Sequence, residues 1–190
     1  MNPSLRLGKI FGIPIGINYS WFLIFLLVAI SLAYQLEKSH PTWSSAEQWT
    51  LGTAGSILLF CSVLVHELSH SLLAIRMGLP VHGITLFIFG GVSQIAREAS
   101  RPSTEAAIAL VGPLTSLGLA GGFFGLTIVV KPISEHLGAL FSLLALVNLS
   151  LGIFNLVPGF PLDGGRVFRA VVWATSGSYD KATRLASIVG

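Results

Sequence analysis

The residues of this chain that could do chemistry are concentrated in one short segment, His66-Glu67-Leu68-Ser69-His70. On a helix, histidines four positions apart project from one face, so His66 and His70 can bind one zinc ion together. Glu67 stands beside the first histidine, where it can take a proton from a water molecule on that ion. Two histidines leave a catalytic zinc site incomplete, because such sites use three protein ligands and a water. The segment therefore predicts a hydrolytic metal site that needs one more ligand from elsewhere in the chain.

The best candidate for the third ligand is Asp163, which lies in the segment NLVPGFPLDGGR of residues 155–166. Two prolines in this segment must interrupt a helix, and the glycine pair after Asp163 lets the chain turn. Two readings without a metal stay open: the histidine spacing could be a chance match, and Asp163 could be a helix-end carboxylate that faces Arg166. Ionisable side chains within an apolar stretch are costly unless they pair or bind something, which favours the metal site.

Composition indicates what kind of elements must position these residues. Only 19 of the 190 residues are charged, the sum of 11 basic and 8 acidic ones, whereas roughly 25% of a soluble domain is charged. Hydrophobic residues make up 53%, and 21 glycines add to them. A compact soluble domain cannot bury so much apolar surface, and a disordered chain would be polar and rich in charge. A polytopic helical membrane protein is the class that fits.

Four uncharged stretches are long enough to cross a bilayer as helices, which takes about 20 mostly apolar residues. They are residues 10–36, 48–66, 106–130 and 136–162. The first is not a cleavable signal peptide, because its apolar run is too long and no small-residue cleavage site follows it. Its helix should begin near Asn18 or Ser20. We therefore predict an all-α polytopic membrane protein with at least four transmembrane helices.

A fifth uncharged stretch, residues 77–96, is predicted not to cross the membrane. Five of its residues are glycine or proline, which do not suit a helix. Residues 84–89 are mainly β-branched or aromatic, Gly90-Gly91 follows as a turn, and residues 92–95 form a second short run. This order is typical of a β-hairpin, so we expect a membrane-associated hairpin between the second and third spans.

The distribution of basic residues favours the hairpin that does not cross. In that topology the N-terminus, residues 76–101 and the tail after Gly165 share one side, which holds nine of the 11 Lys and Arg residues. Lys38 and Lys131 face the other side. The positive-inside rule then places the N-terminus in the cytoplasm. The same topology brings the histidine pair and Asp163 to one side of the membrane, whereas a crossing segment would separate them.

Cysteine content and charge exclude two further possibilities. Cys61 is the single cysteine, which excludes an internal disulfide and a metal site with several cysteines. The net charge is only +3 and there is no run of Lys or Arg, so nucleic acid is not expected as a partner.

Two motifs together resemble the site-2 protease family of intramembrane zinc metalloproteases. That family pairs HExxH on one transmembrane helix with N-x-x-P-x-x-P-L-D-G on a later one, and residues 66–70 and 155–164 match both without a gap. The resemblance implies one Zn2+ per chain, held by the two histidines and Asp163. It also implies Glu67 as the catalytic base and Asn155 as a residue that holds the substrate or the oxyanion.

Two shorter segments extend the resemblance. The family has a membrane-associated hairpin near its active site, which implies substrate contacts here at Phe89, Gly90, Gly91 and Val92. Family members often show Gly-Pro-x-x-Asn on the third helix, where this chain has Ser116, and the role of Ser116 is left open.

The opening segment LGKIFGIPIGIN is similar to the family's subgroup that often carries C-terminal CBS domains. We therefore expect residues 1–190 to be the transmembrane metalloprotease core of a longer protein. Further spans, the first starting near residue 179, and any CBS domain would then follow beyond it.

The expected function is hydrolysis of a peptide bond within or near a transmembrane segment of a substrate, as in regulated intramembrane proteolysis. A helical substrate must unwind to expose its carbonyls, and residues 81–96 could hold it as an added strand. The expected partners are a single-pass transmembrane protein and the lipid bilayer. The expected location is a prokaryotic or organellar inner or plasma membrane, with the N-terminus and the zinc site toward the cytoplasm.

Two alternatives use the same buried ionisable residues. One is a transporter that relays protons or binds a cation, and the other is a metal-binding membrane scaffold without turnover. Glu67 discriminates between enzyme and scaffold, because a scaffold needs the ligands but not the base.

Overall fold

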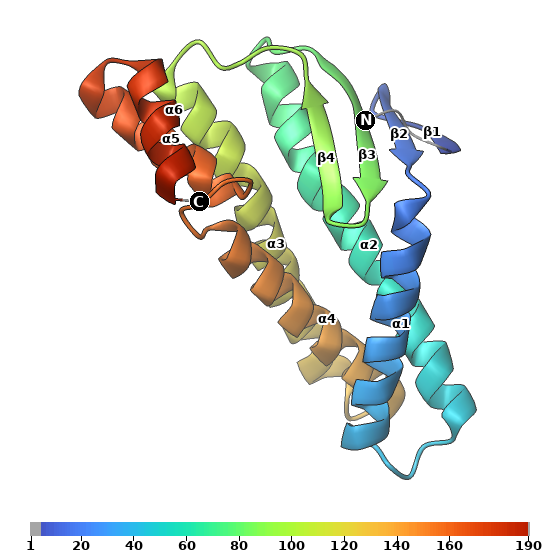
Figure 1. Cartoon of the computed structure of the whole chain (residues 1–190). Coiled ribbons are helices and arrows are strands. Elements are labelled where there is room, and N and C mark those ends of the chain that lie inside the picture. The colour runs from blue at the N-terminus through green and yellow to red at the C-terminus, as the bar shows by residue number, and fades with distance from the viewer. Residues whose placement is uncertain (1–4, 190) are drawn as a thin grey trace.

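The computed structural model describes residues 5–189, which form six helices and four strands (Figure 1). The helices are α1 (Ser20–Ser39), α2 (Ser45–Arg76), α3 (Pro102–Val130), α4 (Glu135–Asn155), α5 (Asp163–Ser176) and α6 (Tyr179–Val189). The strands are β1 (Leu5–Ile10), β2 (Ile13–Ile17), β3 (Val81–Phe87) and β4 (Gly90–Ile95). The predicted class, a helical polytopic protein with a hairpin between its second and third long helices, is confirmed.

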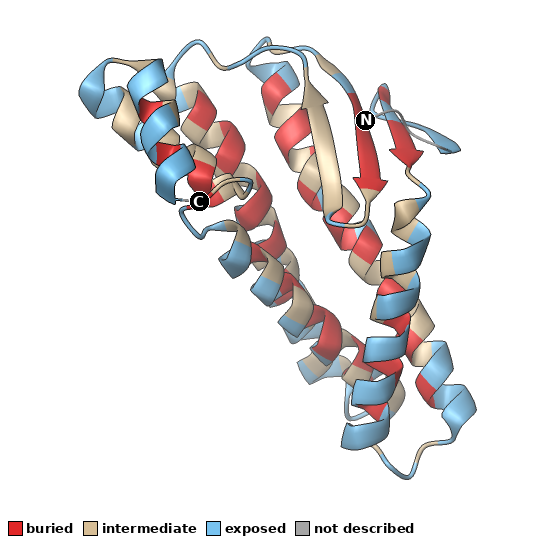
Figure 2. Cartoon of the chain, viewed as in Figure 1, coloured by how far each residue is buried: buried red, intermediate tan, exposed pale blue. Residues whose placement is uncertain are grey.

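Four helices, α1 to α4, are long and apolar enough to cross a membrane. Their outer faces expose large apolar side chains, such as Leu23 and Leu27 on α1 and Leu146 and Ile153 on α4 (Figure 2). Water is a poor environment for apolar faces of this size, so the chain is a multi-pass integral membrane protein. Residue 179, near which a further span is expected, begins α6, which runs to the last described residue, Val189.

The first spanning helix, α1, begins at Ser20, as predicted, because Pro14 and Gly16 do not suit a helix; strand β2 occupies the start of the stretch 10–36. The structure corrects the predicted limits of two other spans. Helix α2 continues ten residues beyond His66 to Arg76, so the histidine pair lies inside a helix. The fourth span ends at Asn155, before the prolines.

The sheet is larger than the predicted hairpin. Its strand order is β1-β2-β3-β4, with β2 and β3 parallel and the other two pairs antiparallel. The hairpin turn falls between Phe87 and Gly90, and not at Gly90-Gly91 as expected. The sequence does not predict strands β1 and β2, because their isoleucines are continuous with the first apolar span.

One face of the sheet packs on α2 and fixes the position of the site. Ile13 and Ile15 of β2 and Ile84 of β3 form a buried cluster with Leu68, which lies between the two histidines in sequence. Because strand side chains alternate between faces, this packing orients the whole sheet relative to α2. It leaves β4 as an edge strand alongside the Glu67 side of α2.

Candidate metal centre

Three ligand atoms from two distant parts of the chain, the middle of α2 and the start of α5, lie close together. Nε2 of His66 and Nε2 of His70 are 3.1 Å apart, and each lies 3.1 Å from Oδ2 of Asp163. The histidines are nearly inaccessible, with 4% and 3% of their surface exposed. The structure thus brings together the three residues that the sequence singled out as candidate metal ligands.

The other nitrogen of each histidine is held by α3. Nδ1 of His70 donates to the backbone carbonyl of Ile108 at 2.6 Å, and Nδ1 of His66 lies 2.9 Å from Oγ of Ser116. A carbonyl can only accept, so the proton of a neutral His70 is on Nδ1 and its Nε2 presents a lone pair. This second hydrogen bond is the arrangement by which metal-binding histidines are oriented. Ser116, whose role the sequence left open, therefore orients His66.

The three donors fit a zinc ion. Two imidazole nitrogens and one carboxylate oxygen are ligand types that zinc uses, with bonds of about 2.0–2.2 Å. A tetrahedral ion with such bonds has ligand atoms about 3.3–3.6 Å apart, a few tenths of an ångström more than the 3.1 Å observed on all three edges. Without a metal ion or a proton between them, the Nε2 lone pair of a neutral His70 and the Asp163 carboxylate would face each other in a buried site, which is unfavourable.

A glycine of α3 gives the donors their space. A Cβ atom at Gly112 would lie only 2.6 Å from Nε2 of His66, too close for any side chain to be accommodated. The backbone of α3 therefore packs directly against the donor atoms. A glycine is required at this point of close approach.

Asp163 reaches the centre because it is the first residue of α5. Gly165, next but one in the chain, packs where a Cβ would lie 2.6 Å from the carbonyl carbon of Gly159, so the loop before α5 folds tightly onto the helix start. Burial opposes ionisation of Asp163, but imidazole rings that carry a proton on Nε2 donate hydrogen bonds to it, and these outweigh burial and lower the pKa of its carboxyl to about 2. The ionised form, which is the form that binds metal, is thereby favoured.

A buried ion pair that the sequence did not reveal holds α5 against α3. Nε of Arg169 donates to Oε1 of Glu105 at 2.8 Å, and Nη2 of the same arginine also contacts that oxygen. The arginine lies over the rings of Phe160 and Tyr179, 5.3 and 4.9 Å from their centroids. Glu105 is almost fully buried. Because Arg169 is on the same helix as Asp163, this pair fixes the position of the third donor.

Glu67 lies next to the donors and is oriented by the hairpin. Oγ of Ser93 on β4 donates to Oε2 of Glu67 at 2.9 Å, and Oγ of Ser71 donates in turn to Ser93 at 3.0 Å. A Cβ at Gly91 would lie 3.1 Å from Cδ of Glu67, so a glycine on β4 leaves room for the carboxylate. The two serines could not be recognised in the sequence, where nothing related them to Glu67.

The donors, Glu67 and the hairpin tip share one cleft of about 360 Å³. The residues expected to contact substrate all line it, namely Phe89, Gly90, Gly91, Val92 and Asn155. Phe89 is 88% exposed at the tip. The amide nitrogen of Asn155 donates to the carbonyl of Leu151 at 2.9 Å, within its own helix. The cleft lies between the edge strand β4 and the segment that leads from α4 into α5.

The sequence matches the profile of peptidase family M50 over residues 54–139 and 126–190. A candidate zinc metalloprotease of Synechocystis is 44% identical over 192 residues, which cover 100% of this chain and 50% of that protein. A zinc metalloprotease of Methanocaldococcus jannaschii is 37% identical over 196 residues, with 100% of this chain and 51% of that protein covered. The chain therefore spans about half the length of the curated relatives it matches.

The fold is similar to a solved structure, the site-2 protease from Methanocaldococcus jannaschii. The two chains superpose with a TM-score of 0.58 and are 34% identical in sequence. The likeness covers 96% of this chain and 77% of the other. The structural similarity therefore extends over the helices and the sheet, and not over residues 66–70 alone.

Proposed function

The chain belongs to peptidase family M50, the site-2 protease family, and from this we propose that it is an intramembrane zinc metalloprotease that cleaves a peptide bond within or near a transmembrane segment of a membrane protein. The observation that carries the proposal is the convergence of three donor atoms beside Glu67, in a cleft bordered by an edge strand. Regulated intramembrane proteolysis of a single-pass substrate is the process that such an activity would serve.

Each polar group of the site has a role in the proposed reaction. Zinc held by His66, His70 and Asp163 would supply Lewis-acid activation of water and of the scissile carbonyl. Glu67 accepts the proton that the attacking water loses and delivers it to the leaving amine. One of its carboxylate oxygens is held by Ser93, so the other can face the reacting groups.

The proposed role of Asn155 is stabilisation of the oxyanion. An amide nitrogen carries two donors, and one of them bonds the carbonyl of Leu151. The other is proposed for the oxygen on which negative charge develops.

Substrate binding is proposed at the edge of β4. Its position at the end of the sheet leaves one row of backbone groups without a neighbouring strand among residues 5–189. An extended peptide can pair with such an edge, which supplies main-chain hydrogen bonds and keeps the scissile bond accessible. Phe89, Gly90, Gly91 and Val92 would contact it, since they line the cleft.

The transporter and the scaffold account for less of the site. A transporter that relays protons needs the buried ionisable groups but does not need an edge strand beside them. A scaffold needs the three donors but not a carboxylate that Ser93 orients toward the same cleft.

The direct test is incubation of the purified protein with a model transmembrane substrate. Cleavage should occur, stop when a zinc chelator is added, and return when zinc is restored. Cleavage that persists in the apo protein would overturn the metalloprotease assignment, and absence of cleavage with every single-pass substrate tried would favour the scaffold.

The proposed orientation places the N-terminus and the donors toward the cytoplasm, since nine of the 11 basic residues then share that side. Single cysteines at Ser100 and Ser134, in a Cys61→Ala background, should label from opposite sides of a sealed membrane. Labelling of both from the same side would overturn this topology.

A further inference from the structure

A second pocket, of about 420 Å³, is lined by residues of the four strands and by none of α2. Ile13, Ile15 and Ile84 pack toward α2, so the residues that alternate with them point to the other face. These include Gly16 and Gly83, which line the pocket. The pocket shares no lining residue with the metal cleft, so it is a separate feature of the fold.

A β-bulge brings two cations to this pocket. Strand β1 pairs with β2 through Arg6 opposite Gly16 and Lys9 opposite Pro14, with one extra residue between Arg6 and Gly8. In a regular strand, residues three apart point to opposite faces, and the extra residue places Arg6 and Lys9 on the same one. Gly8 adopts a φ of +136°, a conformation that favours glycine and permits the bulge.

The lining is positive and has no acidic partner. Arg6 and Lys9 line one wall, His82 of β3 lies opposite, and none of the lining residues is Asp or Glu. Gly16 and Gly83 contribute no side chain to the lining, and the carbonyl oxygen of Pro14 packs over Gly83, 2.9 Å from where a Cβ would lie. Two cations around a concave floor are complementary to an anion such as a phosphate.

The pocket lies close to the point where the chain enters the membrane. Strand β2 ends at Ile17, and the first spanning helix begins at Ser20. Strand β1 also exposes Leu5 and Leu7 on either side of Arg6, so apolar and basic side chains alternate along it. Apolar side chains interleaved with cations are typical of a segment that lies in the headgroup region.

From these observations we propose that the outer face of the sheet, around Arg6, Lys9 and His82, binds the anionic headgroup of a membrane phospholipid. The lipid phosphate is placed between the two cations, and the acyl chains run beside α1. Such a lipid ties β1 and β2 to the membrane surface and thereby supports the sheet that carries the cleft.

The test measures lipid retained by the full chain after reconstitution in vesicles of phosphatidylcholine and phosphatidylglycerol and mild re-extraction, with native mass spectrometry as the readout. The wild-type chain should retain phosphatidylglycerol in preference to phosphatidylcholine. The double variant Arg6→Gln/Lys9→Gln should lower its affinity for phosphatidylglycerol by about 25-fold, because each cation near an anionic headgroup contributes about fivefold. The matched control, Lys181→Gln/Arg184→Gln on α6, removes the same charge and should retain the lipid as the wild type does.

A second variant tests the site without removing a cation. His82→Glu adds a negative charge opposite Arg6 and Lys9 and should lower retention by about fivefold. Equal retention in all variants, or an equal loss in the α6 control, would overturn the proposal. Displacement of the lipid by soluble glycerol phosphate at comparable concentration would also overturn it, since the ligand would then be a soluble anion.

Discussion

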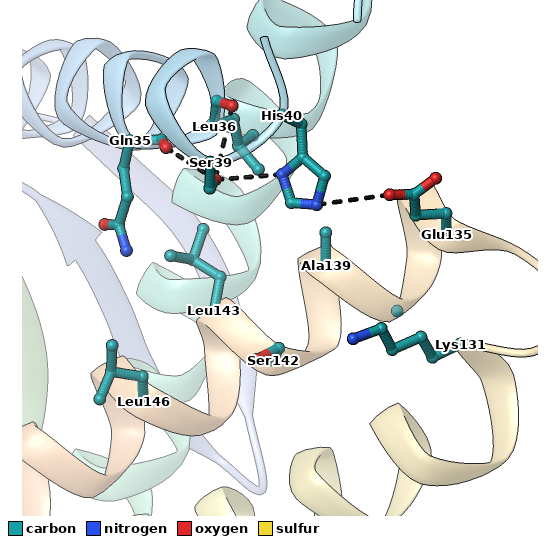
Figure 3. Close-up of a pocket in the computed structure, with 11 residues that line it drawn as sticks. Gln35, Leu36, Ser39, His40, Lys131, Glu135, Ala139, Ser142, Leu143 and Leu146 are labelled. Atoms are coloured by element: carbon teal, nitrogen blue, oxygen red, sulfur yellow. Dashed lines mark hydrogen bonds and ion pairs between the residues drawn. The ribbon is translucent and has the colours of Figure 1, made fainter. Parts of the chain in front are cut away.

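The two ends of the helical bundle each hold two histidines and carboxylates, yet they are built differently. At one end the histidines of α2 converge on a single oxygen of Asp163, with all three ligand atoms 3.1 Å apart. At the other end His40 faces Glu135 at 3.7 Å, across a pocket of about 230 Å³ between α1 and α4 (Figure 3). His136 faces a different carboxylate, Glu47, at 3.1 Å.

Stacking explains why this second cluster does not converge. The rings of His40 and His136 lie on Trp43, with centroids 4.0 and 4.2 Å from it. Each histidine therefore directs its polar edge to its own neighbouring carboxylate, and at this end of residues 5–189 they share no common acceptor.

The comparison teaches that residue types alone do not make a metal site. Both ends of the bundle contain the residue types of a metal site. Only around His66 and His70 do a backbone carbonyl and the Ser116 hydroxyl orient the imidazole rings, and Gly112 leaves the rings space. Burial then leaves a cation as the group that satisfies the three donors.

The largest effect should come from removing a donor. His66→Ala, His70→Ala or Asp163→Asn should reduce bound zinc, measured by elemental analysis of the purified protein, to background, because two remaining ligands hold zinc poorly. His40→Ala and His136→Ala, the matched variants at the other end, should keep the wild-type zinc content. Full zinc in His66→Ala would contradict the ligand set.

Loss of the base should leave the metal in place. Glu67→Gln should bind zinc as the wild type does but cleave a transmembrane substrate about 10²–10⁴-fold more slowly, since a general base contributes that much. Glu135→Gln, an exposed carboxylate of the other cluster, is the control and should cleave normally. A wild-type rate in Glu67→Gln would refute the proposed mechanism.

The next largest effect, on folding stability and zinc affinity, should come from breaking the ion pair between α3 and α5. Arg169→Gln leaves Glu105 buried without its cation, which should lower the free energy of unfolding by about 3–5 kcal/mol. Zinc affinity should fall as well, because α5 carries Asp163. The double variant Glu105→Gln/Arg169→Gln removes both charges and should recover most of the stability in a denaturant titration. If the single variant is as stable as wild type, the pair does not position α5.

A smaller effect is expected at the hydroxyl that orients His66. Ser116→Ala should weaken zinc binding by about 10–100-fold, the usual effect of losing a partner of a metal-bound histidine. Ser116→Thr keeps a hydroxyl and should keep most of the affinity. Ser150→Ala, which removes an exposed hydroxyl on α4, is the control for competition titrations with a chelator. Unchanged affinity in Ser116→Ala would show that α3 does not orient the ring.

The sequence is informative where a residue type is rare in its surroundings. Two histidines and a carboxylate stand out in an apolar helix, and Asp163 stands out beside prolines and glycines, so the amino-acid order alone singles out both. The hairpin is predicted for a similar reason, because β-branched and aromatic residues next to glycines do not suit a membrane helix.

The sequence is uninformative where helices must be placed relative to one another. Ser116 is 50 residues from His66, and Arg169 is 64 residues from Glu105. Nothing local in the chain sets the rotation of α3 that brings them together. Strand β2 escapes prediction because an alternation of isoleucine with proline and glycine, ending at Ile17, runs directly into an apolar span.

The smallest effect is expected at the cluster around Trp43, and it completes the comparison. His136→Ala removes an ion pair whose side chains are 42% and 46% exposed. Exposed pairs contribute about 1 kcal/mol or less, and salt screens them. The free energy of unfolding should therefore fall only slightly, and high salt should reduce the difference further.

Zinc content and cleavage should both be unchanged in His136→Ala, because its ring lies at the opposite end of α2 from the donors. His136→Gln, which keeps a polar group but not the imidazole, separates loss of stacking on Trp43 from loss of charge: if stacking dominates, both variants lose the same stability and neither responds to salt. A loss of zinc in His136→Ala comparable to that in His66→Ala would contradict the comparison itself. It would mean that the two ends of the bundle are coupled through α2, and that the cluster around Trp43 supports the donors from a distance.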